Sequence, residues 1–381
     1  MAVGIIAEYN PFHKGHKYHI DSTIKATGDD IVAIISGNFV QRGEPALLKK
    51  HIRAKMALLN GVSMVLELPV EYATGSADIF AFGAVNILND CSIIDKLSFG
   101  SEKGETAIFE NIAQILNDEP SLFKSYLKEN LSLGMSYPLA RNSALESYTG
   151  KKLDFMNKPN NILALEYIRQ LQKLNSHIKP FTVERIVSDY NSNNLTGEIS
   201  SASAIRKAIL NNDNSALNSM PNNCREFLNE ANSPLIDDFS QILAYILRTQ
   251  SLENISEYAD ITEGLENRIA NTNFNTITEL IESIKTKRYT YSKLQKAILH
   301  ILINIKKIDQ TKKPKYIRVL GFRKDKKHIL SEMVSKAKIP VVIGVKENEN
   351  LLKKEILSTD IYNIPLGIAK GEEYKNGVVV I

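Results

Sequence analysis

The sequence predicts an α/β protein with a doubly wound parallel sheet, followed by a mainly helical C-terminal region. Three observations support this fold class: apolar runs of strand length in the first hundred residues, helical segments between these runs, and helical periodicity over residues 225–310. Consecutive apolar positions are typical of strands that helices cover on both faces. Strands and helices that alternate in this order form parallel sheets with right-handed crossovers.

The elements of the sheet follow one another along the first hundred residues. The predicted strands are residues 2–8, 31–36, 62–68 and 93–100. The predicted helices run from Gly15 to Thr27, where Gly28 would end the helix, from Pro45 to the Asn60–Gly61 pair, and from Ala77 to Asn89. Ligands of such sheets bind beyond the carboxyl ends of the strands.

After Gly104 the pattern becomes mostly helical. It predicts a helix over residues 160–174, a strand over 179–190 and a helix over 199–210. The polar, turn-rich stretch 211–223 predicts a boundary between a first domain, 1–215, and a second domain, 216–381. Short strand-like runs at 316–322, 339–345 and 377–381 give the second domain a small α/β tail.

The composition is that of a globular protein. The chain has 381 residues, of which 43% are apolar and 24% charged, enough for two or three domains. We expect no membrane span and no signal peptide, because no apolar run reaches 18 residues and no charged segment leads into a hydrophobic one. Two distant cysteines, Cys91 and Cys224, favour a reducing cytoplasm over a disulfide framework or a Cys-rich zinc site.

Positive charge is concentrated in one segment. Residues 281–328 contain 15 Lys/Arg and 3 Asp/Glu, whereas the whole chain has a net charge of only +4. Such a segment is typical of proteins that bind a polyanion, and equally of a solvated lysine-rich face.

Three histidines follow the first predicted strand, in the stretch GIIAEYNPFHKGHKYHI. His13 and His16 flank Gly15 at the start of the first helix, where backbone N–H groups and the helix dipole favour phosphate. Two imidazoles there could donate hydrogen bonds to a phosphate that gains charge in a transition state. A metal site with His19 is the weaker reading, because no acidic or cysteine ligand has suitable spacing nearby. Exposed histidines without a role are the remaining alternative.

Two short motifs carry a resemblance to a known superfamily. HKGH is similar to the HxGH signature of the nucleotidyltransferases, which include class I aminoacyl-tRNA synthetases and cofactor adenylyltransferases. ISSASAIRK resembles their second signature, of the ISSTxIR type, in which a serine and an arginine hold the β- and γ-phosphates of ATP. The resemblance implies their HUP-like Rossmann fold. It assigns phosphate contacts to Ser200, Ser201, Ser203 and Arg206, with the choice of hydroxyl open because Ala202–Ser203 replaces a plain threonine.

Longer strings resemble one family within this superfamily, the bacterial tRNA(Met) cytidine acetate ligases. They are the histidine stretch together with SGNFVQRGEPA, LSFGSE, KPNNILALEY and KRYTY. This resemblance implies that the chain activates acetate with ATP to acetyl-adenylate. It also implies transfer of the acetyl group to N4 of the wobble cytidine of elongator tRNA(Met), which gives N4-acetylcytidine.

The resemblance also implies which residues form the site. His13, His16 and Arg206 would be catalytic. ATP would be bound by the following residues: Ile6, Ala7, Glu8, Tyr9, Asn10, Pro11, Phe12, His13, Lys14, Gly15, His16, Lys17, Tyr18, His19, Gly100, Asn160 or Asn161, Arg185, Ile186, Ser201, Ser203 and Arg206. Mg²⁺ is compatible with this chemistry, but the sequence contains no dedicated cluster of carboxylates for it.

The remaining predictions concern the other substrates. Asn38, Gln41 and Arg42 follow the second strand and are expected to face acetate or cytidine, with capping roles in a loop as the alternative. In the basic segment we expect Lys287, Arg288, Lys293 and Lys296 to lie off the apolar stripe of a helix from Tyr291, in water, and to contact tRNA phosphates. The same array continues just beyond that helix, with Lys306, Lys307, Lys312, Lys313 and Lys315.

Two other functions remain open at this point. A cofactor adenylyltransferase would explain both signatures but not the basic segment. A catalytically silent RNA-binding protein on the same scaffold would explain the basic segment but not the intact His13, His16 and Arg206.

Overall fold

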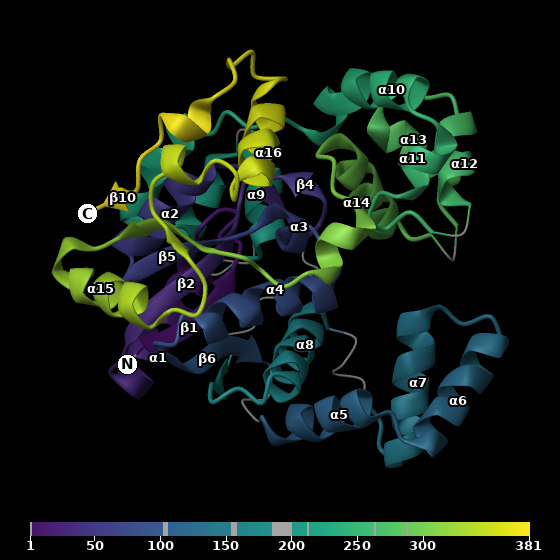
Figure 1. The fold of residues 1–381 in the computed structure, drawn as a ribbon, viewed down its shortest axis with the longest axis horizontal. Helices are drawn as coiled ribbons and strands as arrows, with labels where there is room; N and C mark the ends of the chain where they lie inside the picture. Colours follow the sequence, from purple (N-terminus) through teal and green to yellow (C-terminus); the bar gives the residue numbers. More distant parts are fainter. Residues whose placement is uncertain are drawn as a thin grey trace.

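A single mixed sheet forms the centre of the molecule (Figure 1). The computed structural model describes residues 2–101, 106–153, 158–184, 200–211, 213–262, 264–286 and 289–381. The sheet order is β10-β8-β5-β2-β1-β6-β7, with β9 beside β8. The strands are β1 (Ala2–Ala7), β2 (Asp30–Ser36), β5 (Met64–Leu68), β6 (Ile94–Ser101), β7 (Lys179–Glu184), β8 (Ile317–Phe322), β9 (Val341–Val342) and β10 (Val379–Val380).

The parallel part of the sheet confirms the predicted fold class. β5, β2, β1, β6 and β7 run parallel to one another, and the four strands predicted in the first hundred residues are all present. The predicted strand at 179–190 is described as far as Glu184, and its remainder lies outside the described residues.

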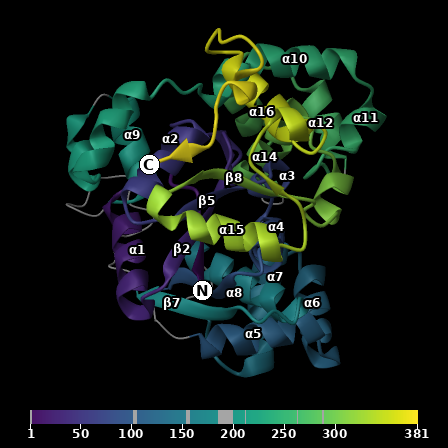
Figure 2. The same cartoon turned by 60° about the vertical axis from the view of Figure 1, so that its left-hand side comes forward.

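Helices cover both faces of the sheet, which explains the unalternating apolar runs. Alternate residues of β2 enter different cores: Ile31, Ala33 and Ile35 pack with residues of α1 (Lys14–Thr27) and α2 (Lys50–Leu59). Val32 and Ile34 belong to the opposite core, with α4 (Ala77–Asp90), α8 (Pro159–Lys173) and α15 (Lys327–Lys336). Figure 2 shows α1 and α15 on opposite sides of the strands.

The second helix begins later than predicted. α2 starts at Lys50 rather than Pro45, because β3 (Phe39–Val40) and β4 (Glu44–Pro45) form a small antiparallel hairpin first. Asn38, twelve residues earlier in the sequence, caps this helix: its Oδ1 accepts a hydrogen bond from the backbone N of Lys50 at 3.0 Å. A short helix, α3 (Val70–Ala73), follows β5.

The rest of the chain is mainly helical, as predicted. Between β6 and β7 the chain forms a peripheral group of helices: α5 (Ala107–Asp118), α6 (Ser121–Ser132) and α7 (Tyr137–Thr149). Helix α9 (Ala202–Leu210) follows β7. The C-terminal helices are α10 (Ser240–Thr249), α11 (Leu252–Ser256), α12 (Leu265–Asn271), α13 (Ile277–Ile284), α14 (Tyr291–Leu302) and α16 (Lys353–Asn363). Short 3₁₀ helices include Asn214–Ser219, Asn222–Glu230, Ile236–Phe239 and Lys307–Thr311. None of the helices in the described residues is long and apolar enough to cross a membrane.

The chain returns to the first sheet after the helical region. β8 pairs antiparallel with β5, and β9 and β10 pair parallel with β8. The predicted boundary at residues 215 and 216 assigns this tail to the second domain, whereas its strands extend the sheet of the first.

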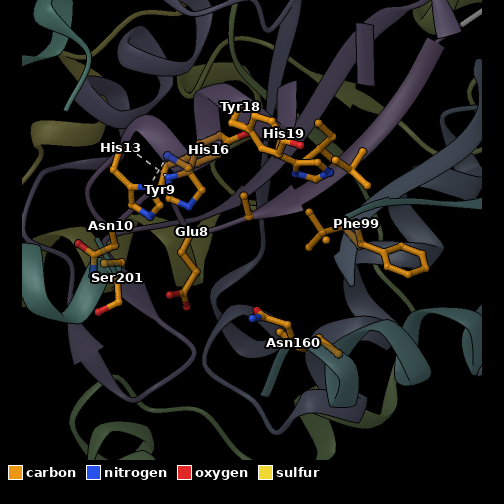
Figure 3. Close-up of a pocket in the computed structure, with 18 of the residues that line it drawn as sticks. Glu8, Tyr9, Asn10, His13, His16, Tyr18, His19, Phe99, Asn160 and Ser201 are labelled. Atoms are coloured by element: carbon orange, nitrogen blue, oxygen red, sulfur yellow. Dashed lines mark hydrogen bonds between the residues drawn. The ribbon is translucent and has the colours of Figure 1, made fainter. Parts of the chain in front are cut away.

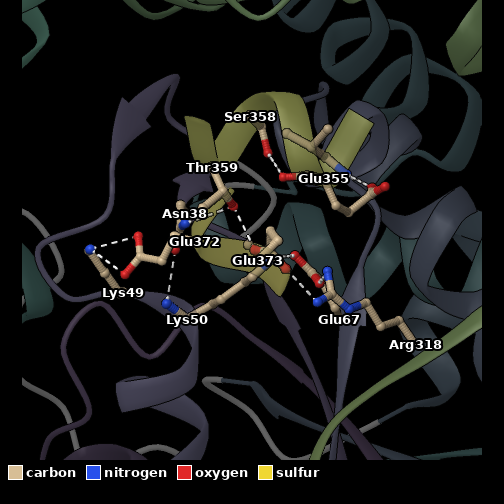
Figure 4. Close-up of polar contacts among 12 residues, drawn as sticks. Asn38, Lys49, Lys50, Glu67, Arg318, Glu355, Ser358, Thr359, Glu372 and Glu373 are labelled. Carbon is tan, nitrogen blue, oxygen red and sulfur yellow. Dashed lines mark hydrogen bonds and ion pairs between the residues drawn. The ribbon is translucent and has the colours of Figure 1, made fainter. Parts of the chain in front are cut away.

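A buried ionic cluster joins the returning strand to the sheet (Figure 4). Arg318 of β8 contacts Glu67 of β5 at 2.8 Å and Glu373 at 2.5 Å, and Lys50 contacts the same two carboxylates at 2.8 and 2.5 Å. All four side chains are at most 3% exposed. Burial alone would raise the pKa of Glu373, but Lys50 and Arg318 outweigh burial and hold this pKa below its ordinary value.

Candidate functional site

A cavity of about 230 Å³ opens at the carboxyl ends of β1 and β6, where the sheet topology predicts a ligand (Figure 3). Its lining contains Ile5, Ile6, Ala7, Glu8, Tyr9, Asn10, His13, Gly15, His16, Tyr18, His19, Gln41, Phe80, Phe99, Gly100, Asn160, Leu163, Tyr167, Val183, Glu184, Ser200, Ser201 and Ala202. The N-terminal ends of α1, α8 and α9 all reach this lining. None of the described lining residues is a lysine or an arginine, so within the described lining the groups suited to a phosphate are the helix N-termini and the N–H groups of the histidines.

The two signature histidines form the N-cap of α1, and this fixes the tautomer of both rings. His13 Nδ1 accepts from the backbone N of Gly15 at 3.1 Å, and His16 Nδ1 accepts from the backbone N of His13 at 3.3 Å. A neutral ring whose Nδ1 accepts must carry its proton on Nε2. The rings stack with centroids 3.7 Å apart, so the two Nε2–H donors act as a pair.

The turn before α1 is held rigidly from both sides. Tyr9, at φ 50°, and Phe12 are buried and pack on His16, with ring centroids 4.9 and 5.6 Å from it. Arg206 of α9 donates from Nη1 to the carbonyl of Asn10 at 2.9 Å. Arg206 therefore connects the second signature to the first.

Two of the three serines at the start of α9 line the cavity, and the third does not. Ser200 and Ser201 line the cavity, and Ser201 also caps α9 by accepting from the backbone N of Ala204 at 3.1 Å. Ser203 is outside the lining and accepts from Arg206 Nη2 at 3.5 Å. Position therefore favours Ser200 and Ser201 as the hydroxyls that contact phosphate.

The structure brings most of the predicted ATP-binding residues together. Ten of residues 6–19 line the cavity. Four others do not: Phe12 and Pro11 are buried beneath the turn, while Lys14 and Lys17 lie outside the lining, Lys17 in an ion pair with Asp21 at 2.5 Å. His19 Nε2 is 2.9 Å from Ser98 Oγ, which indicates a role in joining α1 to β6.

The end of β6 forms the other side of the cavity. Gly100 lines it as predicted, and Asn160 of α8 does so whereas Asn161, 1% exposed, does not. Figure 3 shows the Asn160 amide directed toward the cavity, so position favours Asn160 of the two asparagines. Sequence reasoning missed the apolar wall formed by Phe80, Phe99, Leu163, Tyr167 and Val183, because its members also look like ordinary core residues.

The three residues predicted to face acetate or cytidine lie in different places in the structure. Gln41 lines the cavity, and its backbone N donates to Glu8 Oε1 at 2.7 Å. Arg42 is exposed and outside the lining. Asn38 is 2% exposed and faces away from the cavity, where its amide N donates to Thr359 at 3.1 Å (Figure 4). Arg185 and Ile186 lie outside the described residues.

Lys293 and Lys296 are half-buried and hydrogen-bonded to the protein, whereas the sequence led us to expect them in water. Lys296 Nζ donates to the carbonyl of Gly75 at 3.0 Å, and burial lowers its pKa; Lys293 Nζ donates to Thr262 at 3.1 Å. The N-terminal half of α14 packs on the β3–β4 hairpin, where a Cβ on Gly43, at φ +81°, would lie 2.9 Å from the Lys296 backbone N. Lys287 and Arg288 lie outside the described residues. The described part of the chain contains no group of three His, Cys, Asp or Glu that could hold a metal ion.

Comparison with known proteins identifies this arrangement. The HIGH nucleotidyl transferase family model matches residues 1–376. The tRNA(Met) cytidine acetate ligase of Acetivibrio thermocellus is 41% identical over 100% of this chain and 99% of its own length. This chain belongs to the tRNA(Met) cytidine acetate ligase family. The ligase of Clostridium perfringens is 40% identical over 94% of each chain, and the resemblance read from the sequence motifs is confirmed.

Solved structures of this ligase family have the same fold. The apo crystal structure of Thermotoga maritima TmcAL superposes with a TM-score of 0.93 and 30% identity, over 100% of this chain and 99% of that chain. The structure of the same protein bound to alpha-thio ATP gives a TM-score of 0.90 at 31% identity.

Proposed function

We propose that the chain activates acetate with ATP to acetyl-adenylate and transfers the acetyl group to N4 of the wobble cytidine of elongator tRNA(Met). The observation that carries this proposal is the paired Nε2–H groups of His13 and His16 at a helix N-terminus, in a cavity that α9 and α8 also reach with their N-termini. The ligase relatives and the ATP-analogue complex of TmcAL support it. A cytoplasmic location remains a prediction.

The geometry accounts for the first step without a nucleophile from the protein. The acetate carboxylate attacks the α-phosphorus, the bond to the β-phosphate breaks, and pyrophosphate leaves with the electron pair. The two imidazoles donate hydrogen bonds to the phosphate oxygens as their charge grows, and the helix dipoles favour the same charge. The rigid turn at Tyr9 and Phe12 keeps these donors in place before ATP arrives.

Incubation with ATP and acetate, with and without bulk tRNA, tests the proposal. We expect acetate-dependent pyrophosphate release without RNA, and transfer of radiolabelled acetyl to RNA when tRNA is present. A cofactor adenylyltransferase would show neither acetate dependence nor labelled RNA, and a silent RNA-binding protein would release no pyrophosphate. Either result contradicts the proposal.

Replacing Arg206 by alanine should raise the KM for ATP by about 10- to 100-fold, the cost of losing a hydrogen-bonding charged group. The variant loses the hydrogen bond to the Asn10 carbonyl, and Asn10 lines the cavity; it also loses the guanidinium that the second signature assigns to the phosphates. The affinity for tRNA should change by less than about threefold. Lysine at this position cannot make the forked contact, so Arg206→Lys should recover little. An unchanged ATP titration would mean that Arg206 only stabilises α9.

A further inference from the structure

A second cavity, of about 280 Å³, lies away from the ATP site. Three separate segments form it: α3 with the residue before it, residues 309–316, and residues 350–355 at the start of α16. No sequence motif unites these segments. The ATP-site lining contains none of them.

Exposed lysines surround this cavity. Lys312, Lys313, Lys315 and Lys353 all line it and are all exposed. Within the described part of the chain, none of the four has a carboxylate within ion-pair distance, whereas their neighbour Lys354 contacts Asp309 at 2.6 Å. Lys353 also occupies the first turn of α16, where the helix dipole disfavours a cation. Four ammonium groups without a carboxylate partner make this concave surface attractive to anions.

The carboxyl groups at the floor do not cancel this charge. Lys354 Nζ lies 2.6 Å from Asp309 Oδ1 and 3.8 Å from Glu71 Oε1. Burial, and the neighbouring Glu355, raise the pKa of Glu71 to about 8, so Glu71 is mostly protonated at neutral pH. Burial likewise raises the pKa of Glu355. The cavity therefore carries a net positive charge, which is concentrated at its rim.

We propose that this lysine-rimmed cavity is a docking site for the phosphate backbone of the RNA substrate. The proposal rests on the proposed function, which supplies RNA as the polyanion. Lysine is a point charge that binds phosphate without reading bases, so the site would position the RNA rather than select its sequence. A rim built from two distant segments suits several successive phosphates better than one small anion. Concave surfaces of one sign also focus the field and speed capture of a charged partner.

The structure thus narrows the predicted RNA surface to a part of the basic segment. The side chains of Lys293 and Lys296 are engaged by the protein, whereas Lys312, Lys313 and Lys315 of the same basic segment are presented to solvent. Lys353 joins them from outside that segment.

Replacement of all four rim lysines by glutamine (K312Q, K313Q, K315Q, K353Q) tests the proposal in the full-length protein. tRNA binding is measured by fluorescence anisotropy at a series of salt concentrations. Because each phosphate contact releases counterions, the slope of log K against log salt should become shallower by about 3, with affinity at low salt down by about tenfold or more. A matched control, K128Q, K151Q, K152Q and K173Q, removes four exposed lysines elsewhere and should leave the slope nearly unchanged.

The possible outcomes are distinct. A rim variant that folds normally by thermal unfolding, and whose slope changes no more than that of the control, overturns the docking proposal. Binding of an acidic protein at this cavity would give that same result. Acetate-dependent pyrophosphate release without RNA is measured on the unmodified protein in parallel. Its absence refutes the proposed function, even if the rim variant loses tRNA binding as expected.

Discussion

Replacing His16 by alanine should lower the rate of acetyl-adenylate formation by about 100- to 1,000-fold, the usual cost of one preorganised donor to a developing charge. The change removes the Nε2–H group and also the acceptor that fixes the backbone N of His13. Pyrophosphate release from ATP and acetate, measured at saturating ATP, is the assay. The loss should appear in kcat more than in KM, because the contact strengthens in the transition state.

Two further variants separate chemistry from folding. His16→Gln places an amide N–H near the position of Nε2 and should recover part of the lost rate. His177→Ala, which removes an exposed histidine outside the cavity, should leave the rate unchanged. His16→Ala also loses packing on Tyr9 and Phe12, so its unfolding temperature must be compared with that of the unmodified protein. A folded His16→Ala protein with near-normal pyrophosphate release would refute the role assigned to His16.

Replacing Arg318 by methionine should destabilise the protein by about 3 to 5 kcal/mol, since it leaves buried carboxylates short of a partner. Glu67 and Glu373 would then share one cation, Lys50, at positions that are at most 3% exposed. Urea unfolding followed by circular dichroism measures the free energy of unfolding. The effect should be among the largest of any single substitution away from the ATP site.

Arg323→Met is the matched control. Arg323 pairs with Asp325 at 2.9 Å on the surface, where an ion pair contributes at most about 1 kcal/mol. A double variant that also changes Glu373 to glutamine should be less destabilised than the sum of the two single variants, because it removes one of the uncompensated charges. Equal destabilisation by Arg318→Met and Arg323→Met would show that the cluster contributes nothing beyond surface charge.

The parallel part of the fold could be read from the sequence because its strands are buried on both faces. That environment requires consecutive apolar residues, as in IVAIIS, which also distinguishes these strands from surface loops. The hairpin of β3 and β4 could not be read in this way. Each of its strands is only two residues long, and Pro45 is as typical of a helix start as of an edge strand.

The ATP site likewise contains residues that the sequence could place and residues that it could not. HKGH and SSASAIRK could be placed because they are local motifs at helix starts, and a local motif keeps its geometry in the fold. Phe99 and Tyr167 could not be placed, since apolar residues that line a cavity have the same sequence pattern as those that fill a core. The environment of Lys296 could not be predicted for a different reason. Helical periodicity shows which face of α14 is apolar, but not that the β3–β4 hairpin covers a second face.

The pairing of β8 with β5 imposes an order on biosynthesis. About 250 residues separate the end of β5 at Leu68 from the start of β8 at Ile317, so at 5–20 residues per second the ribosome needs roughly 12 to 50 s to deliver the missing strand. Throughout that interval β5 is an open edge with unpaired backbone groups, a template for association with other nascent chains. During the same interval Lys50 and Glu67 lack two of their partners in the ionic cluster, Arg318 and Glu373. We therefore expect chaperones, or rapid completion of the chain, to protect the nascent N-terminal sheet until its last strands are synthesised.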